Sequence, residues 1–333
     1  MALTEKSTDF RRILVTGAAG FIGGACARQF LARGFRVTAL AHHRAPEGLE
    51  GAEVAYRSLL DRQGLADLLE VSGPFGAVIH CAGLASDVAA PKHLLDANYH
   101  AVRNLVECLS RHPSARLVHV STTDVYGIRD FVDADENTPL DDNRHNAYAR
   151  SKILAERCIA AGLPASRYVL LRPGAVCGQG DTTILPRVLG FLHGSRYVVH
   201  FGRWRGSNRW PLANVQNVAV ATVLAATCDE AAGQSYNVVD PQLTTVEQYN
   251  RWVLHTFLPD KVAMRSITIP LGVAWPYAFA STCLARLTRR GHPLFEPSLY
   301  ALYSIASNLD LSSRKLEGLF TRHGERFIDS LTT

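Results

Sequence analysis

A glycine-rich turn, Thr16-Gly-Ala-Ala-Gly-Phe-Ile-Gly23, interrupts the first regular pattern of the chain. A short apolar run before it is typical of a buried strand, a helix is expected after it, and a second strand is expected over residues 36–40. In such a turn Gly17 permits a tight bend, Gly20 lets the backbone approach a pyrophosphate, and Gly23 lets the helix pack closely on the sheet. The turn therefore predicts the first half of a βαβ unit that binds a dinucleotide.

The alternation of strand and helix patterns continues along the chain. Further strands are expected over residues 54–60, 77–80, 116–120 and 235–239, with helices over 94–110 and 215–226. Because helical crossovers join parallel strands, this order predicts the α/β class: a Rossmann, doubly wound parallel sheet with a smaller C-terminal substrate lobe. We expect a nucleotide-binding domain of residues 10–175 and 213–240, and a substrate-binding lobe of residues 176–212 and 241–333.

The end of the expected second strand bears on the choice of cofactor. An enzyme that uses NAD usually places an acidic residue here, on the adenosine ribose. This chain has Leu40-Ala-His-His-Arg44 instead, with no carboxylate to repel a 2′-phosphate and an arginine to pair with it. NADP is therefore the expected cofactor, held in part by His42 and Arg44, with NAD as the alternative. A polar loop that contacts no cofactor would explain the same residues.

Small and hydroxyl-bearing residues follow two of the expected strands, at the edge where open parallel sheets bind their ligands. The strand over 77–80 ends in Cys81-Ala-Gly83, which leaves room for a ligand. The strand over 116–120 ends in Ser121-Thr-Thr-Asp124. Its hydroxyls are suited to hydrogen-bond a substrate carbonyl or alcohol.

A tyrosine and a lysine, Tyr148 and Lys152, are four residues apart in a segment that is expected to be helical. Residues at this spacing lie one above the other on a helix face, so the ammonium is expected close to the phenol. A free tyrosine titrates near pH ~10, and a nearby cation lowers that pKa, which suits a proton shuttle at neutral pH. By itself the pair also fits a surface tyrosine beside a solvated lysine.

Composition restricts the other classes of function. The chain is 47% apolar and 20% charged, which is typical of a globular enzyme, and its formal net charge is +5. The arginines are scattered and form no basic run, so no nucleic-acid partner is expected. The seven cysteines form no Cys-x-x-Cys pair and the thirteen histidines show no zinc-site spacing. We therefore expect reduced thiols, a cytoplasmic location and no metal.

Together these motifs resemble the extended short-chain dehydrogenase/reductases of the NAD-dependent epimerase/dehydratase superfamily, over nearly the whole chain. The matching segments are residues 16–23, 80–83, 98, 121–127, 148–152, 171–181 and 214–219. In the segment 171–181, Cys177 replaces the family's usual tyrosine. Thr123 stands where the nucleotide-sugar 4,6-dehydratases carry an aspartate, which argues against elimination chemistry even though Asp124 remains.

The resemblance implies a catalytic set of Thr122, Tyr148 and Lys152. Tyr148 would act as general acid/base and Thr122 would hydrogen-bond the reacting oxygen, while Lys152 would bind the nicotinamide ribose and lower the tyrosine pKa. Cofactor contacts are expected at Gly17, Ala19, Gly20, Phe21, Ile22, His42, Arg44, Leu60, Cys81, Ala82, Gly83, Asn98, Tyr148, Lys152 and Pro173. Substrate contacts are expected at Leu84, Thr122, Thr123, Asp124, Cys177 and Arg209.

The C-terminal part contains a charge-free stretch, Ser266 to Ala285. Its length approaches the ~20 residues of a membrane span. Pro270 and Pro276 interrupt it, however, so no transmembrane segment is expected. A buried hairpin or helix of the substrate lobe is one interpretation, and peripheral contact with a membrane is another. This apolar part resembles the 3-beta-hydroxysteroid dehydrogenase-like branch, which acts on apolar alcohols and ketones.

We therefore expect an NADP(H)-dependent oxidoreductase that interconverts a secondary alcohol and a ketone on an apolar small molecule. By analogy with relatives, a homodimer is expected. One alternative is a nucleotide-sugar epimerase that keeps its NAD(P) bound, since sugar-nucleotide relatives often place an arginine on the diphosphate near the position of Arg209. Another is a non-catalytic regulator that senses the dinucleotide, although such proteins usually lose the tyrosine and lysine.

Overall fold

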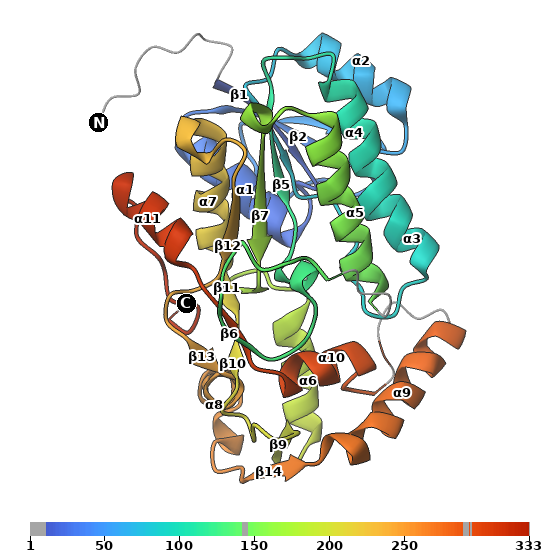
Figure 1. The fold of residues 1–333 in the computed structure, drawn as a ribbon, viewed down its shortest axis with the longest axis vertical. Coiled ribbons are helices and arrows are strands. Elements are labelled where there is room, and N and C mark those ends of the chain that lie inside the picture. Colours follow the sequence, from blue (N-terminus) through green and yellow to red (C-terminus); the bar gives the residue numbers. More distant parts are fainter. Residues whose placement is uncertain (1–10, 142–145, 289–292, 294, 333) are drawn as a thin grey trace.

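The computed structural model describes residues 11–141, 146–288, 293 and 295–332 (Figure 1). Its centre is a seven-stranded parallel sheet in the order β12-β7-β5-β4-β1-β2-β3. The strands are β1 (Arg12–Thr16), β2 (Arg36–Ala41), β3 (Glu53–Tyr56), β4 (Ala77–His80), β5 (Arg116–Val120), β7 (Tyr168–Pro173) and β12 (Ser235–Val238). The predicted α/β class with a doubly wound parallel sheet is confirmed.

Helices cover both faces of this sheet (Figure 1). One face carries α1 (Phe21–Ala32) and α7 (Val215–Thr227), and the other carries α2 (Arg62–Ser72), α4 (Ala101–Leu109) and α5 (Ala147–Gly162). Strands buried on both faces need continuous apolar runs, and Ile13, Leu14 and Val15 of β1 are all 0% exposed. The carboxyl ends of the strands point toward the smaller lobe.

The last described helix, α11 (Arg314–Arg322), returns to the sheet. Its Leu316, Leu319 and Phe320 are buried in the same core as α1 and α7. Although residues 241–333 are expected in the substrate-binding lobe, this helix packs on the nucleotide side. For the rest of the chain we propose the expected division at residues 175, 213 and 240; the boundary at residue 10 lies outside the described residues.

Short strands and helices build the smaller lobe and its connections. The strands form parallel or antiparallel pairs: β6 (Phe131–Ala134) with β15 (Leu309–Leu311), β8 (Ala175–Cys177) with β11 (Leu212–Asn214), β9 (Val198–Phe201) with β14 (Ser266–Ile269), and β10 (Arg209–Trp210) with β13 (Thr244–Thr245). The helices are α6 (Ile184–Gly194), α8 (Val246–Phe257), α9 (Leu271–Leu287) and α10 (Leu299–Ala306). The charge-free stretch thus forms a strand and a helix.

The expected helix over 94–110 is not continuous. It begins as α3 (Pro91–Leu95), widens into a π turn over Asp96–His100, and continues as α4. Such π turns are rare and are frequently found at functional sites. The turn contains Asn98, whose side chain is 1% exposed and hydrogen-bonded toward β4.

A buried polar network fastens α5 to the sheet. Arg172 of β7 binds Glu156 of α5 through two hydrogen bonds, Nε to Oε1 at 3.1 Å and Nη2 to Oε2 at 2.7 Å. Arg172 also donates to the Tyr126 hydroxyl at 2.8 Å, and that hydroxyl donates to Asn237 of β12 at 2.7 Å. The Glu156 and Arg172 side chains are 3% and 7% exposed. Despite its burial, contact with Glu156 raises the pKa of Arg172, so the guanidinium stays charged.

Removing one partner of this pair should therefore destabilise the protein strongly. Glu156→Ala leaves a buried guanidinium without its carboxylate, a change that costs about 3–5 kcal/mol of unfolding free energy. The matched control is Glu107→Ala, which breaks a 2.7 Å pair with Arg62 between side chains that are 41% and 56% exposed and should cost less than about 1 kcal/mol. Unfolding in urea, followed by circular dichroism, compares the two. Equal losses would contradict this account of how α5 is held.

Candidate functional site

The glycine turn after β1 fits a dinucleotide pyrophosphate. Gly17 has a φ of +68°, and a Cβ there would lie 2.7 Å from the backbone N of Ala82. A Cβ on Gly23 would clash with the Gly17 carbonyl oxygen. Gly20 precedes α1 in an extended conformation and brings no side chain to cap it. The first N–H groups of α1, which have no partner inside the helix, are thus accessible to a phosphate.

The end of β2 lies against this turn. The Arg44 guanidinium donates a hydrogen bond to the carbonyl oxygen of Ala19, inside the glycine turn. The rings of the preceding residues His42 and His43 contact each other in a tilted arrangement, with centroids 3.6 Å apart. Arg44 therefore lies at the turn itself, with its side chain exposed to solvent. This position suits a contact with a phosphate on the adenosine side of a dinucleotide.

The end of β4 is closely packed, so only small residues fit there. A Cβ on Gly83 would lie 2.8 Å from Asn98 Oδ1 and 3.4 Å from Lys152 Nζ. The Asn98 amide accepts a hydrogen bond from Leu84 N at 2.8 Å and donates to the Leu84 carbonyl and to Ser151 Oγ at 3.0 and 2.9 Å. Asn98 thus ties the loop after β4 to α5. The structure brings Gly83, Leu84, Asn98 and Lys152 together as a group.

Lys152 is buried in the site and is only 6% exposed. Its ammonium donates to the carbonyl oxygen of Val120, the last residue of β5, at 2.9 Å. Burial lowers the pKa of Lys152 to about 8. The rings of His80 and His119 stack nearby at 5.3 Å between centroids. Burial, and after it the charge of Lys152, lowers the pKa of His80 to about 3, so this imidazole stays neutral.

Tyr148 lies one helical turn from Lys152, close to the end of β5. Burial, and after it the charge of Asp124, raises the pKa of its phenol, while a hydrogen bond with the Thr122 side chain lowers it. The expected lowering by Lys152 is wrong for this structure, because the ammonium bonds the Val120 carbonyl and burial outweighs the favourable contacts. At neutral pH the phenol keeps its proton.

Asp124 and Tyr300 form a contact that the sequence did not reveal. The Tyr300 hydroxyl, from α10, donates to Asp124 Oδ2 at 2.6 Å. Burial raises the pKa of Asp124, and the hydrogen bond from Tyr300 opposes this shift. Asp124 in turn raises the pKa of Tyr300 and of Tyr148. One carboxyl group therefore influences two phenols, Tyr148 from the nucleotide side and Tyr300 from the smaller lobe.

A second contact holds the smaller lobe over the site. Arg187 of α6 binds Asp87, in the loop after β4, at 2.9 Å, and it binds Glu296 through two hydrogen bonds at 2.6 and 3.0 Å. Ser298, which caps α10, donates to the same Asp87 carboxylate. These partners connect α6, α10 and the loop after β4. Neither Asp87 nor Arg187 belongs to a motif, so no pattern in the sequence pointed to them.

Other expected site residues lie apart from this cluster. Cys177 is 2% exposed and packs in the core of the smaller lobe, where burial raises its pKa to about 12. The Arg209 guanidinium donates to the Leu243 carbonyl at 3.0 Å and holds β10 beside β13. Leu60 is 51% exposed at the end of the segment after β3. Thr123 differs from these three: it lies between Thr122 and Asp124 and is 7% exposed inside the short helix after β5.

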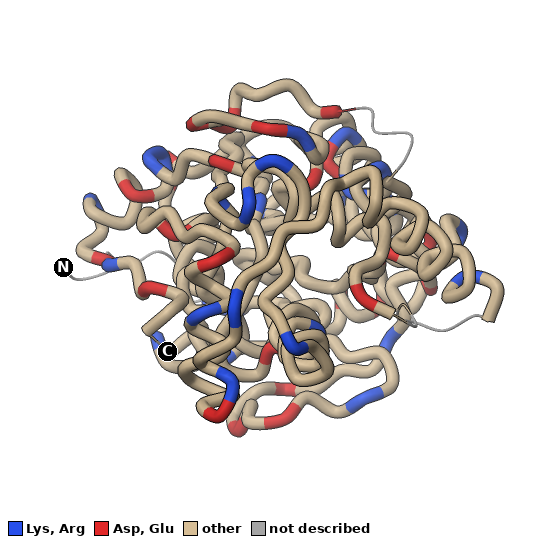
Figure 2. Tube along the Cα trace, turned by 90° about the horizontal axis from the view of Figure 1, so that it is seen from below, with Lys and Arg blue, Asp and Glu red and all other residues tan. Residues whose placement is uncertain are grey.

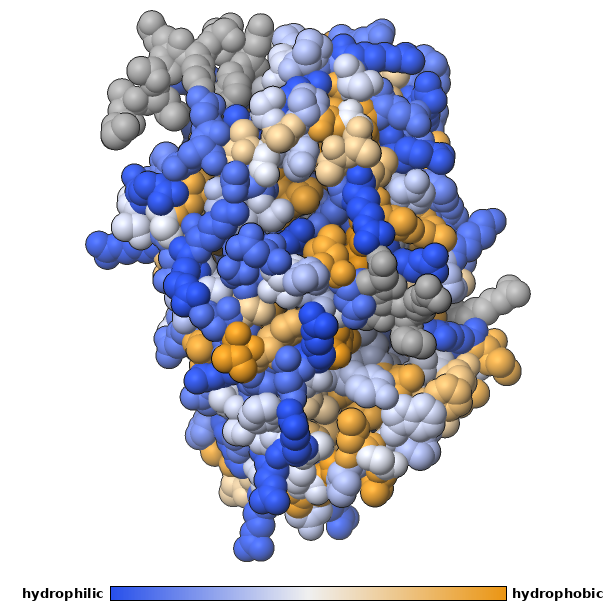
Figure 3. All heavy atoms as spheres, viewed as in Figure 1, coloured by the Kyte–Doolittle hydropathy of each residue, from blue (hydrophilic) through white to orange (hydrophobic). Residues whose placement is uncertain are grey.

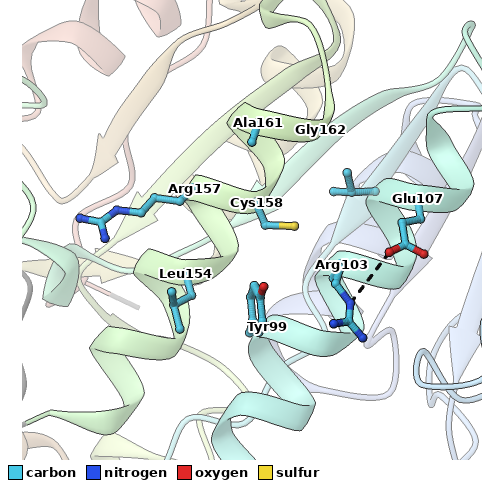
Figure 4. A pocket seen from close by; sticks show the side chains of 9 residues that line it. Tyr99, Arg103, Glu107, Leu154, Arg157, Cys158, Ala161 and Gly162 are labelled. Carbon is cyan, nitrogen blue, oxygen red and sulfur yellow. Dashed lines mark ion pairs between the residues drawn. The ribbon is translucent and has the colours of Figure 1, made fainter.

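A groove in the described residues lies away from this cluster. It has a volume of about 470 Å³ and lies between α4 and α5, lined by side chains such as Tyr99, Arg103, Leu154 and Cys158 (Figure 4). It contains none of the catalytic residues expected from the motifs. Lysines and arginines are scattered among acidic residues along the chain and do not gather into a stripe (Figure 2). Within the described residues, no group of three or more metal-ligating side chains is suited to hold an ion.

Comparison with known proteins agrees with this geometry. A dTDP-4-dehydro-6-deoxy-D-allose reductase from Streptomyces sp is 33% identical over 192 residues, which is 51% of this chain and 57% of that protein. A 3 beta-hydroxysteroid dehydrogenase/Delta 5-->4-isomerase from Mycobacterium tuberculosis is 28% identical over 268 residues, 76% of this chain and 71% of that protein. The alignment with the reductase thus spans little more than half of that protein's length.

The fold is shared with solved structures. The crystal structure of a Thermus thermophilus UDP-glucose 4-epimerase in complex with NAD superposes with a TM-score of 0.67 at 24% identity, over 95% of this chain and 93% of that chain. The model of one family, described as the NAD dependent epimerase/dehydratase family, matches residues 13–238. That match covers the glycine turn, the strand ends and the Tyr148 helix together, and the family resemblance predicted from the motifs is confirmed. The chain belongs to the NAD dependent epimerase/dehydratase family.

Proposed function

We propose that this protein is an NADP(H)-dependent oxidoreductase that interconverts a secondary alcohol and a ketone on an apolar small molecule. The observation that carries the proposal is the group of Thr122, Tyr148 and Lys152 at the carboxyl ends of the strands, beside a glycine turn that fits a pyrophosphate. The similarity to a steroid dehydrogenase supports the alcohol–ketone chemistry. The apolar packing of α9 and α10, with Ala278 and Leu302 at its centre, supports an apolar substrate.

The cofactor would lie along the carboxyl edge of the sheet. Gly17, Gly20 and the start of α1 would hold the pyrophosphate, Arg44 a 2′-phosphate, and Lys152 the nicotinamide ribose. When bound, the nicotinamide supplies or accepts the hydride. The residues of the chain then have only to orient the reacting carbon and to move one proton.

Tyr148 is proposed to move that proton at its Oη. Because its phenol is neutral, it is ready to donate a proton to a carbonyl oxygen as the alcohol forms. Thr122, hydrogen-bonded to Tyr148, is placed to orient the same oxygen. Asp124, held by Tyr300, keeps negative charge close to the phenol and so favours its protonated form. At neutral pH the phenol is therefore in the protonated state that ketone reduction requires.

Two features of the surroundings belong to the same proposal. The groove between α4 and α5 is offered as the contact face of a homodimer, since it is open and lies away from the catalytic group. A cytoplasmic location is proposed because all seven cysteines are free thiols.

Replacing Tyr148, the proposed general acid, should greatly lower the reaction rate and leave cofactor binding intact. We expect Tyr148→Phe to lower the rate of NADPH-dependent reduction of a steroid-like ketone by about 10²–10⁴-fold, because general acid catalysis contributes that much. Tyr197→Phe, at a tyrosine that is 45% exposed, is the matched control and should keep full activity. Absorbance of reduced nicotinamide measures the rate, and thermal shift checks that both variants still bind NADPH.

The same assay separates the alternatives. A nucleotide-sugar epimerase would interconvert a UDP-sugar with no net change in reduced nicotinamide and would retain cofactor through purification. A regulator that only binds the dinucleotide would keep its full function in the Tyr148→Phe variant. Either result would overturn the proposed oxidoreductase.

The preference for NADP should depend on Arg44. Removing a hydrogen bond from a charged group costs about 1.5–3 kcal/mol, so Arg44→Ala should weaken NADPH binding by about 10- to 100-fold and leave NADH binding nearly unchanged. Arg314→Ala is the control, since that guanidinium pairs with Asp133 on the outside of the molecule. Titrations followed by thermal shift give the affinities. Tighter binding of NADH than of NADPH by the unaltered protein would reverse the assignment.

The pH dependence should report the charge on Asp124. Asp124 raises the pKa of Tyr148, so Asp124→Asn removes that contribution and the phenol loses its proton at lower pH. Alcohol oxidation requires the deprotonated phenol; its pH–rate curve should therefore shift toward lower pH in Asp124→Asn and stay in place in Asp133→Asn, an exposed control. A shift toward higher pH would show that Asp124 acts in some other way.

A further inference from the structure

Helix α9 buries small side chains and exposes large apolar ones, which is unusual for a helix in contact with water. Small residues face the protein: Ala274, Ala278, Ser281, Thr282 and Ala285 are buried. Large apolar residues face outward, among them Val273, Tyr277 and Leu287, which are 67%, 51% and 84% exposed. A surface helix normally shows the opposite arrangement, with its apolar stripe toward the core.

We call the outward residues Val273, Trp275, Tyr277, Phe279, Leu284 and Leu287 the α9 face. All six are at least 38% exposed. In the space-filling view, orange side chains follow the course of α9 along the lower right of the molecule (Figure 3). Contiguous exposed apolar surface of this kind usually marks a place where something binds.

The aromatic members of the α9 face are held in place. Trp275 and Phe279 stack at 5.0 Å between centroids with an angle of 9° between the rings. The Trp275 indole N–H donates to the Tyr303 hydroxyl at 3.0 Å, and the Tyr277 ring lies 6.3 Å from that of Phe295. Tryptophan and tyrosine combine an apolar body with a polar edge, the combination favoured at the boundary between lipid and water.

The charge of residues 261–295 indicates which kind of partner covers the α9 face. Residues 261–295 contain five Lys or Arg and no Asp or Glu. Of these, Arg265 lies directly before β14 and Arg286 in the last turn of α9, and both are exposed. Anionic lipid headgroups attract such exposed cations when they flank an apolar surface. In a two-fold dimer the α9 faces of two copies would meet, and their positive charges would repel each other.

The α9 face also lies close to the reaction centre. Thr282 of α9 accepts a hydrogen bond from Leu299 N of α10 at 2.8 Å. The next residue of α10, Tyr300, binds Asp124 in the site at 2.6 Å. One helix therefore separates the α9 face from the proposed catalytic group.

From these observations we propose that the α9 face binds the surface of a lipid bilayer that carries anionic headgroups. None of the helices in the described parts of the chain is long and apolar enough to cross a membrane. The helix therefore lies in the plane of the interface, with its aromatic and aliphatic side chains among the headgroups. The link to substrate rests on the proposed function: an apolar ketone dissolved in the bilayer reaches the site beside α10 without crossing water.

Vesicle binding by the full chain tests the proposal without substrate or dinucleotide. We expect the protein to sediment with vesicles of phosphatidylcholine and phosphatidylglycerol, to bind pure phosphatidylcholine vesicles at least tenfold more weakly, and to be released by 0.5 M salt, where charges are screened within about 4 Å. A triple variant, Val273→Gln with Leu284→Gln and Leu287→Gln, should bind at least tenfold more weakly. Arg286→Glu should reduce the preference for the anionic lipid.

The controls are exposed valines elsewhere on the molecule. Val71→Gln and Val132→Gln change side chains that are 85% and 84% exposed, on α2 and β6, and should bind vesicles like the unaltered protein. Unchanged thermal unfolding of the triple variant shows that its fold is intact. The proposal is overturned if the unaltered protein ignores both kinds of vesicle, if the triple variant binds as well as the controls, or if light scattering shows that the triple substitution only dissociates a dimer.

Failure here is distinguishable from failure of the proposed function. Vesicle binding needs no catalysis, and ketone reduction in detergent needs no vesicle. An active reductase that ignores vesicles would refute only the lipid contact. A vesicle-binding protein without reductase activity would refute only the proposed reaction.

Discussion

The site depends on how α5 is fixed to the sheet. Two side chains one turn apart, Lys152 and Glu156, reach inward from this helix and bind the end of β5 and Arg172 near the end of β7. Charged groups are costly to bury unless they are paired, so each tolerates few alternative positions. A shift of α5 by one residue would rotate both away by about 100°. The same two contacts therefore determine where Tyr148 lies relative to Thr122.

Much of the fold was predictable because its strands are buried on both faces. The bounds of β4 and β5 agree with the expected ranges to the residue, since each is a short, mostly apolar run that is followed by small residues. The helix expected over 94–110 was predicted as one element, but it contains a π turn. The cause is tertiary: Asn98 turns its amide toward Leu84 and Ser151, and periodicity in the sequence does not show such a contact.

The site was predictable where residues near one another in sequence meet, and less so elsewhere. The glycine turn, the end of β4 and the Tyr148 helix are local motifs, and the structure gathers them at one edge of the sheet. Tyr300 contacts Asp124 across 176 positions, so neither residue suggested the other. The predicted lowering of the Tyr148 pKa was also wrong. Burial and the charge of Asp124 raise this pKa, and Lys152, four residues away, does not offset them. The four-residue spacing of Tyr148 and Lys152 predicts that they are near each other, but it does not predict how deeply the phenol is buried.

The contact between Tyr300 and Asp124 has a consequence for the order of events during synthesis. Once residue 238 has left the ribosome, every strand of the central sheet exists, and the glycine turn and Tyr148 can already take their places. Tyr300, and the apolar face of α11 that closes the core, are translated only afterwards. A nascent chain can thus form the glycine-turn edge of the sheet before α10 is made, and the contact between Tyr300 and Asp124 forms only after α10 has been translated.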